Sequence, residues 1–241
     1  MEEVGDATFV LHPHDEFPPE CTHLLVRTSG YSRDDQDLNF IKRCPASVKI
    51  INPTVTLEIF RSKNSQYSFF ETHRVPHLPW FDLSEGKLPE NLFPGNLLVK
   101  PRRGFGGWGV RKLSHQEFRL WWESQVAVGD IDYLVQPFAE EAIEYRIFFA
   151  GEFRFKMERT NQSGITANLR TGGEAKKSSL PSEVMIEMES LIKLSGAWYG
   201  AIDLLINRHG FYVLELNVVP GIEQVEALSG RSIIREILRF Y

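Results

Sequence analysis

The sequence predicts a mixed α+β fold, and three segments carry most of that prediction. Residues 200–217 are expected to form an antiparallel hairpin, and residues 145–156 a second one. Residues 96–110 contain two apolar strands joined by a glycine-rich turn. Because antiparallel hairpins recur, the pattern differs from a regular alternation of strands and helices, which would indicate a parallel α/β sheet.

The first 80 residues contain short predicted elements bounded by proline and polar residues. Strands are expected where short apolar runs occur, at residues 9–11, 23–26 and 48–51. Helices are expected at residues 36–43, 54–61 and 65–73. Pro76 and Pro79 then end this part of the pattern.

A capping box predicts the start of the next helix, because Ser114 precedes Glu117 by three residues. The helix is expected to end at Gly129. Helical spacing places four large apolar side chains on its inward face: Phe118, Trp121, Trp122 and Val126. Neighbouring tryptophans can form a ligand platform, but this spacing is more typical of a core, so we interpret them as core residues.

The remaining chain continues the mixed pattern. A strand at residues 133–136 is interrupted by Pro137, and the polar residues 160–180 are expected to form a long loop. Pro181 suits the first turn of a helix that stops at Gly196. Its inward residues are Val184, Met188, Leu191 and Ile192. A closing helix is expected at residues 232–240.

The hairpin at residues 200–217 places three oxygen-bearing side chains together. A three-residue loop, 208–210, predicts a register in which Asp203 lies opposite Glu215, with Asn217 farther along the same face. The opposite face is expected to be wholly apolar: Ile202, Leu204, Ile206, Tyr212, Leu214 and Leu216. Acidic side chains on an open hairpin face are usually solvated. Here Leu205, Phe211 and Val213 share the acidic face and suggest that it is covered too.

Carboxylates that cluster on a covered face repel each other unless a cation or a proton lies between them. Mg²⁺ prefers oxygen ligands of this kind, usually one or two carboxylates together with substrate phosphates. The hairpin therefore favours a metal site.

Two further groups indicate anion binding. Lys100 precedes a loop, residues 104–109, whose four glycines let the backbone approach a phosphate, although a flexible hairpin tip is the alternative. Phe105 and Trp108 in this loop suggest closure over a ligand. Farther along, Glu144, Arg146, Lys156 and Arg159 lie on the second hairpin. A glycine-containing loop, residues 164–173, follows them and contains Asn168 and Arg170. A solvated basic rim is the alternative there.

Bulk properties exclude several classes of function. The chain has 241 residues and a net charge of −5, so it lacks the basic footprint expected of a nucleic-acid-binding protein. No apolar run approaches the ~18 residues of a membrane span, and the acidic first residues lack the basic start of a signal peptide. Cys21 and Cys44 are the only cysteines, which fits a reducing, cytoplasmic compartment.

Several of these segments occur in an order that resembles the ATP-grasp superfamily. They are Lys100 with its glycine loop, residues 135–138, Arg146, residues 168–173, and the strands at 200–203 and 213–221. Order and spacing are most similar to RimK-type ribosomal-protein glutamate ligases and to the lysine-biosynthesis ligases that act on an amino-group carrier protein. The resemblance covers about residues 23–241.

The resemblance implies an α+β ATP-grasp fold, in which ATP lies between two lobes behind a short Rossmann-like N-terminal domain. The implied division is an abbreviated front domain at 1–55, a central lobe with a glycine-rich lid at 56–135, and a C-terminal lobe with the metal site at 136–241. The implied reaction is ADP-forming ligation of a carboxylate to an amine through an acyl phosphate, on an amino acid or peptide.

The resemblance also implies roles for individual residues. Asp203, Glu215 and Asn217 would hold Mg²⁺ or Mn²⁺, while Arg146, Arg159 and Asn168 would face the phosphoryl group or the acceptor carboxylate. The implied ATP-binding set is Lys63, Lys100, Gly104, Gly106, Gly107, Gly109, Gln136, Phe138 and Glu144. The hinge at 135–138 has Gln-Pro where the family commonly has Gln-Glu, which leaves an adenine contact through backbone groups.

Two other functions remain open at this stage. One is a catalytically silent, nucleotide-binding regulatory protein with the same fold, and the other is a kinase-like phosphotransferase. ADP release that requires both a carboxylate and an amine would single out the ligase. We expect no nucleic-acid or membrane partner, and a homo-oligomer stays open.

Overall fold

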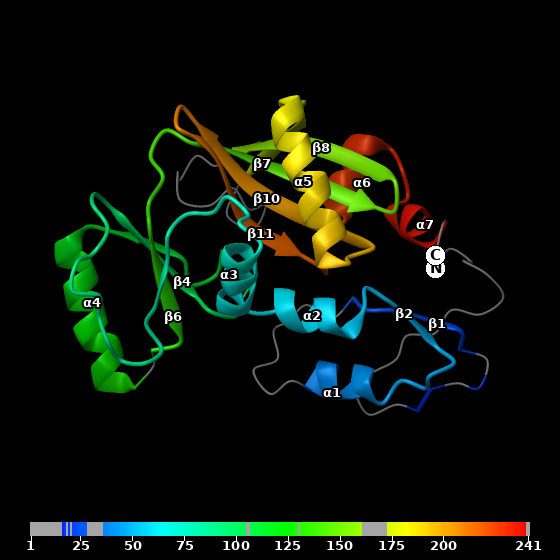
Figure 1. Cartoon of the computed structure of the whole chain (residues 1–241), viewed down its shortest axis with the longest axis horizontal. Helices are drawn as coiled ribbons and strands as arrows, with labels where there is room; N and C mark the ends of the chain where they lie inside the picture. The colour runs from blue at the N-terminus through cyan, green and yellow to red at the C-terminus, as the bar shows by residue number, and fades with distance from the viewer. Residues whose placement is uncertain are drawn as a thin grey trace.

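A computed structural model describes residues 16–17, 19, 21–27, 36–104, 107–129, 131–160 and 173–239. The predicted strand at 9–11 and the predicted site residues Gly106 and Asn168 lie outside this part, as do Phe105 and Arg170. The described elements form a two-stranded, a four-stranded and a five-stranded sheet. Figure 1 shows the four-stranded sheet with one helix on the left and the five-stranded sheet, with its helices, on the right.

The N-terminal part is small and packs beside the five-stranded sheet (Figure 1). It contains β1 (His23–Leu25), α1 (Gln36–Lys42), β2 (Lys49–Ile51) and α2 (Thr54–Phe60), and β1 pairs with β2 in parallel. These four elements were expected. Asn52 follows β2 with a φ of 67° and is fully buried. Its amide donates to the carbonyls of Tyr199 and Val218 at 2.9 and 2.8 Å, which fixes this part to the C-terminal half.

The four-stranded sheet has the order β3-β6-β4-β5 and is antiparallel. Its elements are β3 (Phe81–Asp82), β4 (Leu97–Pro101), β5 (Arg111–Leu113), α4 (His115–Val128) and β6 (Tyr133–Pro137), and α3 (Lys63–Thr72) precedes them. The capping box of Ser114 and Glu117 begins α4, and Gly129 ends it with a φ of 76°. Phe118 and Trp122 are buried as predicted. Val126 is 49% exposed, so its placement on the inward face was wrong.

Pro137 does not interrupt its strand, which corrects the sequence-based interpretation. It is the last residue of β6 and lies opposite Leu97. The next residue, Phe138, donates its N–H to the Asn96 carbonyl at 2.8 Å. Backbone groups alternate in direction along a strand, so the nitrogen of Pro137 faces away from β4. The missing N–H of this proline therefore removes no hydrogen bond between β4 and β6.

The five-stranded sheet has the order β11-β10-β7-β8-β9 and is antiparallel. Its elements are β7 (Ile143–Ala150), β8 (Phe153–Thr160), β9 (Glu174–Lys177), α5 (Ser182–Ser195), β10 (Tyr199–Asn207), β11 (Gly210–Asn217), α6 (Glu223–Ser229) and α7 (Ile233–Leu238). The four predicted inward residues of α5 are buried in the core against one face, and α6 and α7 pack on the other. Strand β9 and helix α6 were not predicted, because residues 160–180 look like a loop and the closing helix looks single.

The hairpin of β10 and β11 has the predicted pairing of Asp203 with Glu215, but for a different reason. Asn207 pairs with Gly210, so the loop contains two residues and not three. A bulge then shifts the register between Asp203 and Leu204, leaving Leu214 as the extra residue.

The bulge also changes which side chains share a face. Val213 lies opposite Leu204, and both are buried in the core on the α5 side. Phe211 packs against the same core, together with Ile206. The predicted apolar face was therefore wrong for Tyr212 and Leu214 and right for Ile202, Leu204, Ile206 and Leu216.

Within the described residues, no helix is both long enough and apolar enough to span a bilayer.

Candidate active site

The central feature of the site is a buried carboxylate held by two arginines on adjacent strands. Asp203 on β10 lies opposite Arg146 on β7. Arg146 donates from Nε to Oδ1 at 2.6 Å and from Nη2 to Oδ2 at 2.5 Å. Arg159 on β8 places Nη1 3.6 Å from Asp203 Oδ1 and 2.8 Å from Glu144 Oε1. The sheet register thus brings four predicted residues together: Glu144, Arg146, Arg159 and Asp203.

The electrostatics of this cluster follow from its burial, since Asp203 is only 6% exposed. Burial alone would raise the pKa of Asp203, but the charges of Arg146 and Arg159 hold that pKa below its ordinary value. Burial likewise opposes the charge of Arg146, yet the contact with Asp203 raises the pKa of Arg146 overall. The pair therefore stays ionised, and its charges are compensated within the sheet.

Glu215 and Asn217 lie on β11 and, together with Asp203 and Glu144, form a group of oxygen-bearing side chains that we call the acidic group. Glu215 lies directly opposite Asp203, and its carboxylate makes no hydrogen bond or ion pair with another described residue. Asn217 accepts a hydrogen bond from the N–H of Val219 at its Oδ1, at 2.9 Å. Gly200 leaves room beside them, because a Cβ there would lie 2.9 Å from the Asn217 carbonyl oxygen and 2.8 Å from Phe149 Cζ.

Lys100 faces this acidic group from the other sheet. It lies on β4 and is 7% exposed, and it makes no hydrogen bond or ion pair with another described residue. Burial, reinforced by the charge of Lys63, lowers the pKa of Lys100 to about 8. The negative charges of Glu215, Glu144 and Asp203 raise the pKa of Lys100, so these carboxylates of the five-stranded sheet lie near the lysine of the four-stranded sheet.

Lys63 and the glycine loop lie next to each other. Lys63 begins α3 and donates from Nζ to the Gly104 carbonyl at 3.3 Å. Gly104, Gly107 and Gly109 all have positive φ. At Gly109 a Cβ would also lie 2.7 Å from Pro101 Cγ, so this position requires glycine.

The predicted hinge residues occupy a different setting from the charged group. The side chain of Gln136 is fully buried, accepts from the Tyr67 hydroxyl at 3.1 Å and donates to the Leu78 carbonyl at 3.3 Å. This side chain therefore belongs to the core, which leaves only the backbone groups of Gln136 for contact with a ligand. Phe138 is half-buried, with the Lys112 ammonium 3.8 Å from its ring centroid.

A family model for the RimK-like ATP-grasp domain matches residues 114–241, which is more than half of the chain. The chain belongs to the RimK-like ATP-grasp family. This segment contains the arginines, the carboxylates and Asn217 described above.

Individual relatives agree with this membership. A probable alpha-L-glutamate ligase of Pasteurella multocida (strain Pm70) is 30% identical over 145 residues, which are 58% of this chain and 46% of that protein. The chain spans about half the length of the curated relatives it matches. The D-cycloserine synthetase DcsG has a TM-score of 0.73 at 15% identity, covering 97% of this chain and 88% of that one. The ATP-grasp ligase PsnB, solved with a phosphomimetic variant of its minimal precursor, Mg and ADP, has a TM-score of 0.61 at 18% identity over 83% and 62% of the two chains. These structures confirm the ATP-grasp fold.

The residues of this ATP-grasp site fit a magnesium ion by the chemistry of their donors. Asp203 and Glu215 are side by side in register, and Glu215 has its oxygens unused among the described residues. No three histidine, cysteine, aspartate or glutamate side chains cluster as metal ligands in the described part of the chain. The carboxylates of Asp203 and Glu215 and the amide of Asn217 could therefore bind Mg²⁺ if phosphate oxygens supplied further ligands. Shared coordination by carboxylates and phosphates is common for this ion.

Sequence reasoning missed two residues that position strand β11 of this ATP-grasp chain. Gln66 and Tyr67 on α3 are buried, and they hold the backbone on either side of Glu215. Gln66 Oε1 accepts from the N–H of Leu216 at 2.5 Å. The Tyr67 hydroxyl, whose single proton is shared between Gln136 Oε1 and the Leu214 carbonyl, lies 3.0 Å from that carbonyl. The signal in the sequence was a glutamine next to a tyrosine within an otherwise apolar helix face, which alone does not name a partner strand.

Proposed function

We propose that the chain is an ATP-dependent, ADP-forming ligase that joins a carboxylate to an amine through an acyl phosphate. Family membership supports the reaction class, and the glutamate ligase of Pasteurella multocida and PsnB are both named as ligases. Activity, substrates and partners belong to the proposal, because the curated relatives are about twice as long as the matched segment.

One observation carries the proposal: a buried lysine faces a group of carboxylates across two sheets. Lys100 supplies a positive charge without a protein partner among the described residues, and Glu215 supplies a negative one. A polyphosphate chain with a bound divalent cation would satisfy both groups at once. A phosphate alone would leave Glu215 unmatched, and a metal alone would leave Lys100 unmatched.

We assign the cofactor-binding residues as follows. Asp203, Glu215 and Asn217 would hold Mg²⁺ or Mn²⁺, which when bound supplies neutralisation of phosphate charge. Lys63 and Lys100 bind and orient the phosphates of ATP. The loop from Gly104 to Gly109, Gly106 and Gly107 included, would close over them and keep water from a labile intermediate. Backbone groups near Gln136 and the ring of Phe138 would contact the adenine.

The reaction needs charge compensation more than covalent help from the protein. A carboxylate oxygen of the acceptor attacks the γ-phosphorus, and ADP leaves. The amine then attacks the acyl carbon, and inorganic phosphate leaves. Arg146, whose pKa is raised chiefly by Asp203, and Arg159 would stabilise negative charge on the transferring phosphoryl group and the acceptor carboxylate. Asn168 is assigned to the same region.

The substrates are proposed by class. The relative named alpha-L-glutamate ligase suggests an amino acid or peptide as the carboxylate and amine partners. We keep the division into a front domain at 1–55, a central lobe at 56–135 and a C-terminal lobe at 136–241 as a proposal. Two cysteines without a disulfide, Cys21 and Cys44, fit a cytoplasmic location, where ATP is abundant.

The test is an ADP-release screen with ATP, Mg²⁺ and pairs of amino acids and short peptides. A ligase releases ADP only when a suitable carboxylate and amine are both present. If ADP release requires a carboxylate or hydroxyl substrate but no amine, the activity is that of a phosphotransferase and not of a ligase. Tight ATP binding without acceptor-dependent release for any pair would leave the silent regulatory protein.

A further inference from the structure

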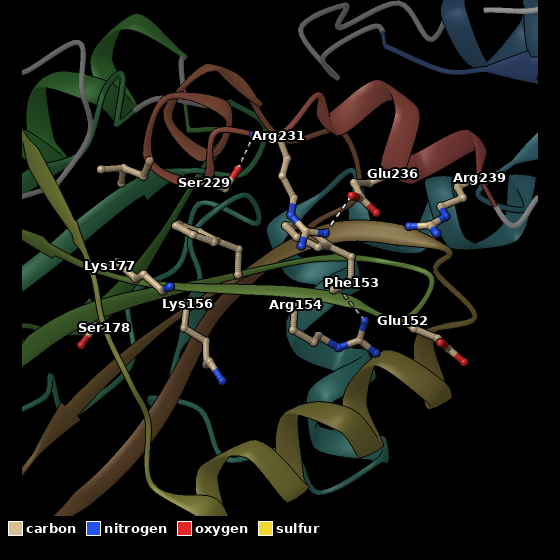
Figure 2. Close-up of a pocket in the computed structure, with 12 residues that line it drawn as sticks. Glu152, Phe153, Arg154, Lys156, Lys177, Ser178, Ser229, Arg231, Glu236 and Arg239 are labelled. Carbon is tan, nitrogen blue, oxygen red and sulfur yellow. Dashed lines mark hydrogen bonds and ion pairs between the residues drawn. The ribbon is translucent and has the colours of Figure 1, made fainter.

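A pocket lies away from the proposed catalytic residues. It has a volume of about 650 Å³ and is lined by the first half of β8, the end of β9 and the segment from α6 to α7. Figure 2 shows Arg231 reaching from the connection between α6 and α7 toward Phe153 on β8. None of the residues assigned to ATP, metal or phosphoryl transfer lines it.

The pocket runs along the edge of the sheet and not over one face. Five consecutive residues of the chain, 152–156, line it. Successive side chains of a strand point to opposite faces, so a pocket touched by all of them must follow the strand edge. Strand β9 pairs only with residues 157–160 of β8, which leaves residues 153–155 without a strand partner on that side among the described residues.

The backbone direction at this edge can be read from one hydrogen bond. The N–H of Ser178 donates to the Lys156 carbonyl at 3.0 Å, so Lys156 directs its backbone groups toward the β9 side. Residues two apart in a strand share that direction. Arg154 therefore presents its N–H and carbonyl to the pocket, where an extended chain could pair with them.

The charge around the edge is positive. Five cationic side chains line the pocket against two acidic ones, in a chain whose net charge is −5. Arg154 is engaged, because Glu189 accepts from its Nε and Nη2 at 2.8 Å each. Lys156 and Lys177 make no ion pair with another described residue.

Arg231 is held in place but keeps free donors. Its Cζ lies 5.5 Å from the ring centroid of Phe153, and its Nη1 lies 3.0 Å from Glu236 Oε1. Its Nε and Nη2 bind no other described residue. A guanidinium fixed in this way can receive a carboxylate with little loss of side-chain entropy.

We propose that this edge docks an acidic peptide in extended conformation. The peptide backbone pairs with Arg154 as an added strand, and its carboxylates contact Lys177 and Arg231. Strand addition supplies affinity through main-chain hydrogen bonds, and the flanking cations select acidic side chains. The docking site goes beyond the ligase reaction and works without ATP.

The first experiment measures fluorescence polarisation of a labelled peptide of about six glutamates, roughly 20 Å when extended, with the full chain at low salt. We expect saturable binding that weakens as salt increases, and no binding of an equally long serine peptide. Lys177→Glu should weaken binding about tenfold. Lys87→Glu, the same charge change at an exposed lysine elsewhere, should change it less than about twofold.

A second experiment separates strand addition from simple charge attraction. Two further glutamate peptides are N-methylated, one at every residue and the other at alternate residues only. Pairing with the edge predicts that the first binds much more weakly than the unmodified peptide and that the second does not, because its remaining N–H groups can all face the edge. Equal binding of both, equal losses in Lys177→Glu and Lys87→Glu, or binding of tripolyphosphate without binding of the peptide would each overturn the proposal. In that case the charges only protect an exposed edge from aggregation.

Discussion

The two sheets that face the proposed nucleotide site balance their charges in different ways. On the five-stranded sheet, Asp203 is compensated by Arg146 and Arg159 on neighbouring strands. On the four-stranded sheet, Lys100 is equally buried but has no ion-pair partner among the described residues, and its pKa is lowered to about 8. The charge of Asp203 is therefore compensated within its own sheet, whereas that of Lys100 is left for an anion of a bound molecule. Substitutions in the two sheets should consequently differ in what they change.

The largest expected effect comes from the carboxylates of the five-stranded sheet. Asp203→Asn and Glu215→Gln should each reduce turnover by roughly 10³-fold, because both remove a proposed metal ligand. Only Asp203→Asn should also lower the free energy of unfolding, by about 3 kcal/mol, since it takes the ionic partner from the buried Arg146, whereas Arg159 keeps Glu144. Glu215→Gln breaks no contact among the described residues and should stay within about 0.5 kcal/mol.

ADP release and urea unfolding measure the two effects separately. Isothermal titration with Mn²⁺ and a non-hydrolysable ATP analogue adds a readout independent of turnover. If Glu215→Gln keeps full Mn²⁺ affinity, the metal assignment fails even if the activity is lost.

The next effect tests the four-stranded sheet. Lys100→Ala should weaken ATP binding by about 30-fold, equivalent to roughly 2 kcal/mol for a hydrogen bond to a charged group. The free energy of unfolding should change by less than about 1 kcal/mol, because a buried charge without a protein partner is removed. Nucleotide titration followed by calorimetry checks this, and unchanged ATP affinity would remove Lys100 from the site.

The pH dependence of ATP binding should show the same lysine. With a pKa of about 8, Lys100 is protonated at pH 7 and mostly neutral at pH 9. If only the cation binds phosphate, affinity should fall about tenfold between these two pH values. Lys100→Arg stays charged across this range, so its binding should show no such fall. A tenfold fall that persists in Lys100→Arg would assign the titration to another group.

Stability should move in the opposite direction over the same range. The unfolded chain keeps the Lys100 proton up to about the ordinary pKa of 10.5, whereas the folded chain loses it near 8. Between these values the unfolded state binds more protons, so the contribution of Lys100 to folding stability increases with pH. Weaker ATP binding at pH 9 is therefore not a sign of unfolding.

Local patterns predicted most of the elements, and the decisive pairing of Asp203 with Glu215 was also predicted. That pairing was reached through two errors that cancelled. A three-residue loop and no bulge give the same register at Asp203 as a two-residue loop followed by a bulge at Leu214. Between loop and bulge the register differs, so the faces of Tyr212 and Val213 were predicted wrongly. Bulges depend on contacts of the neighbouring strand, which period-two patterning does not contain.

The partners of the charged residues depended on contacts far apart in the sequence. Arg146 and Asp203 are 57 positions apart, and nothing local indicates that they pair bidentately. Gln136 looked like a nucleotide ligand because of its place in the motif, but its side chain is used by Tyr67 and Leu78. Strand β9 carries mostly polar residues at a sheet edge and therefore resembled a loop. Motif order predicts which residues gather, but the packing of the folded chain decides what each side chain contacts.

The smallest expected effect concerns the contact that joins the two sheets. The Tyr67 hydroxyl links the buried Gln136 of the four-stranded sheet to the Leu214 carbonyl beside Glu215. Tyr67→Phe removes only this oxygen, so it should lower the free energy of unfolding by about 1 kcal/mol. It should also raise the Mn²⁺ concentration needed for half-maximal binding by about threefold, while ATP affinity measured without metal stays unchanged. The split between metal and nucleotide affinity distinguishes positioning of Glu215 from general destabilisation, since a loosened fold would weaken both. Equal losses in both affinities would show that the hydroxyl stabilises the fold in general and does not specifically position Glu215.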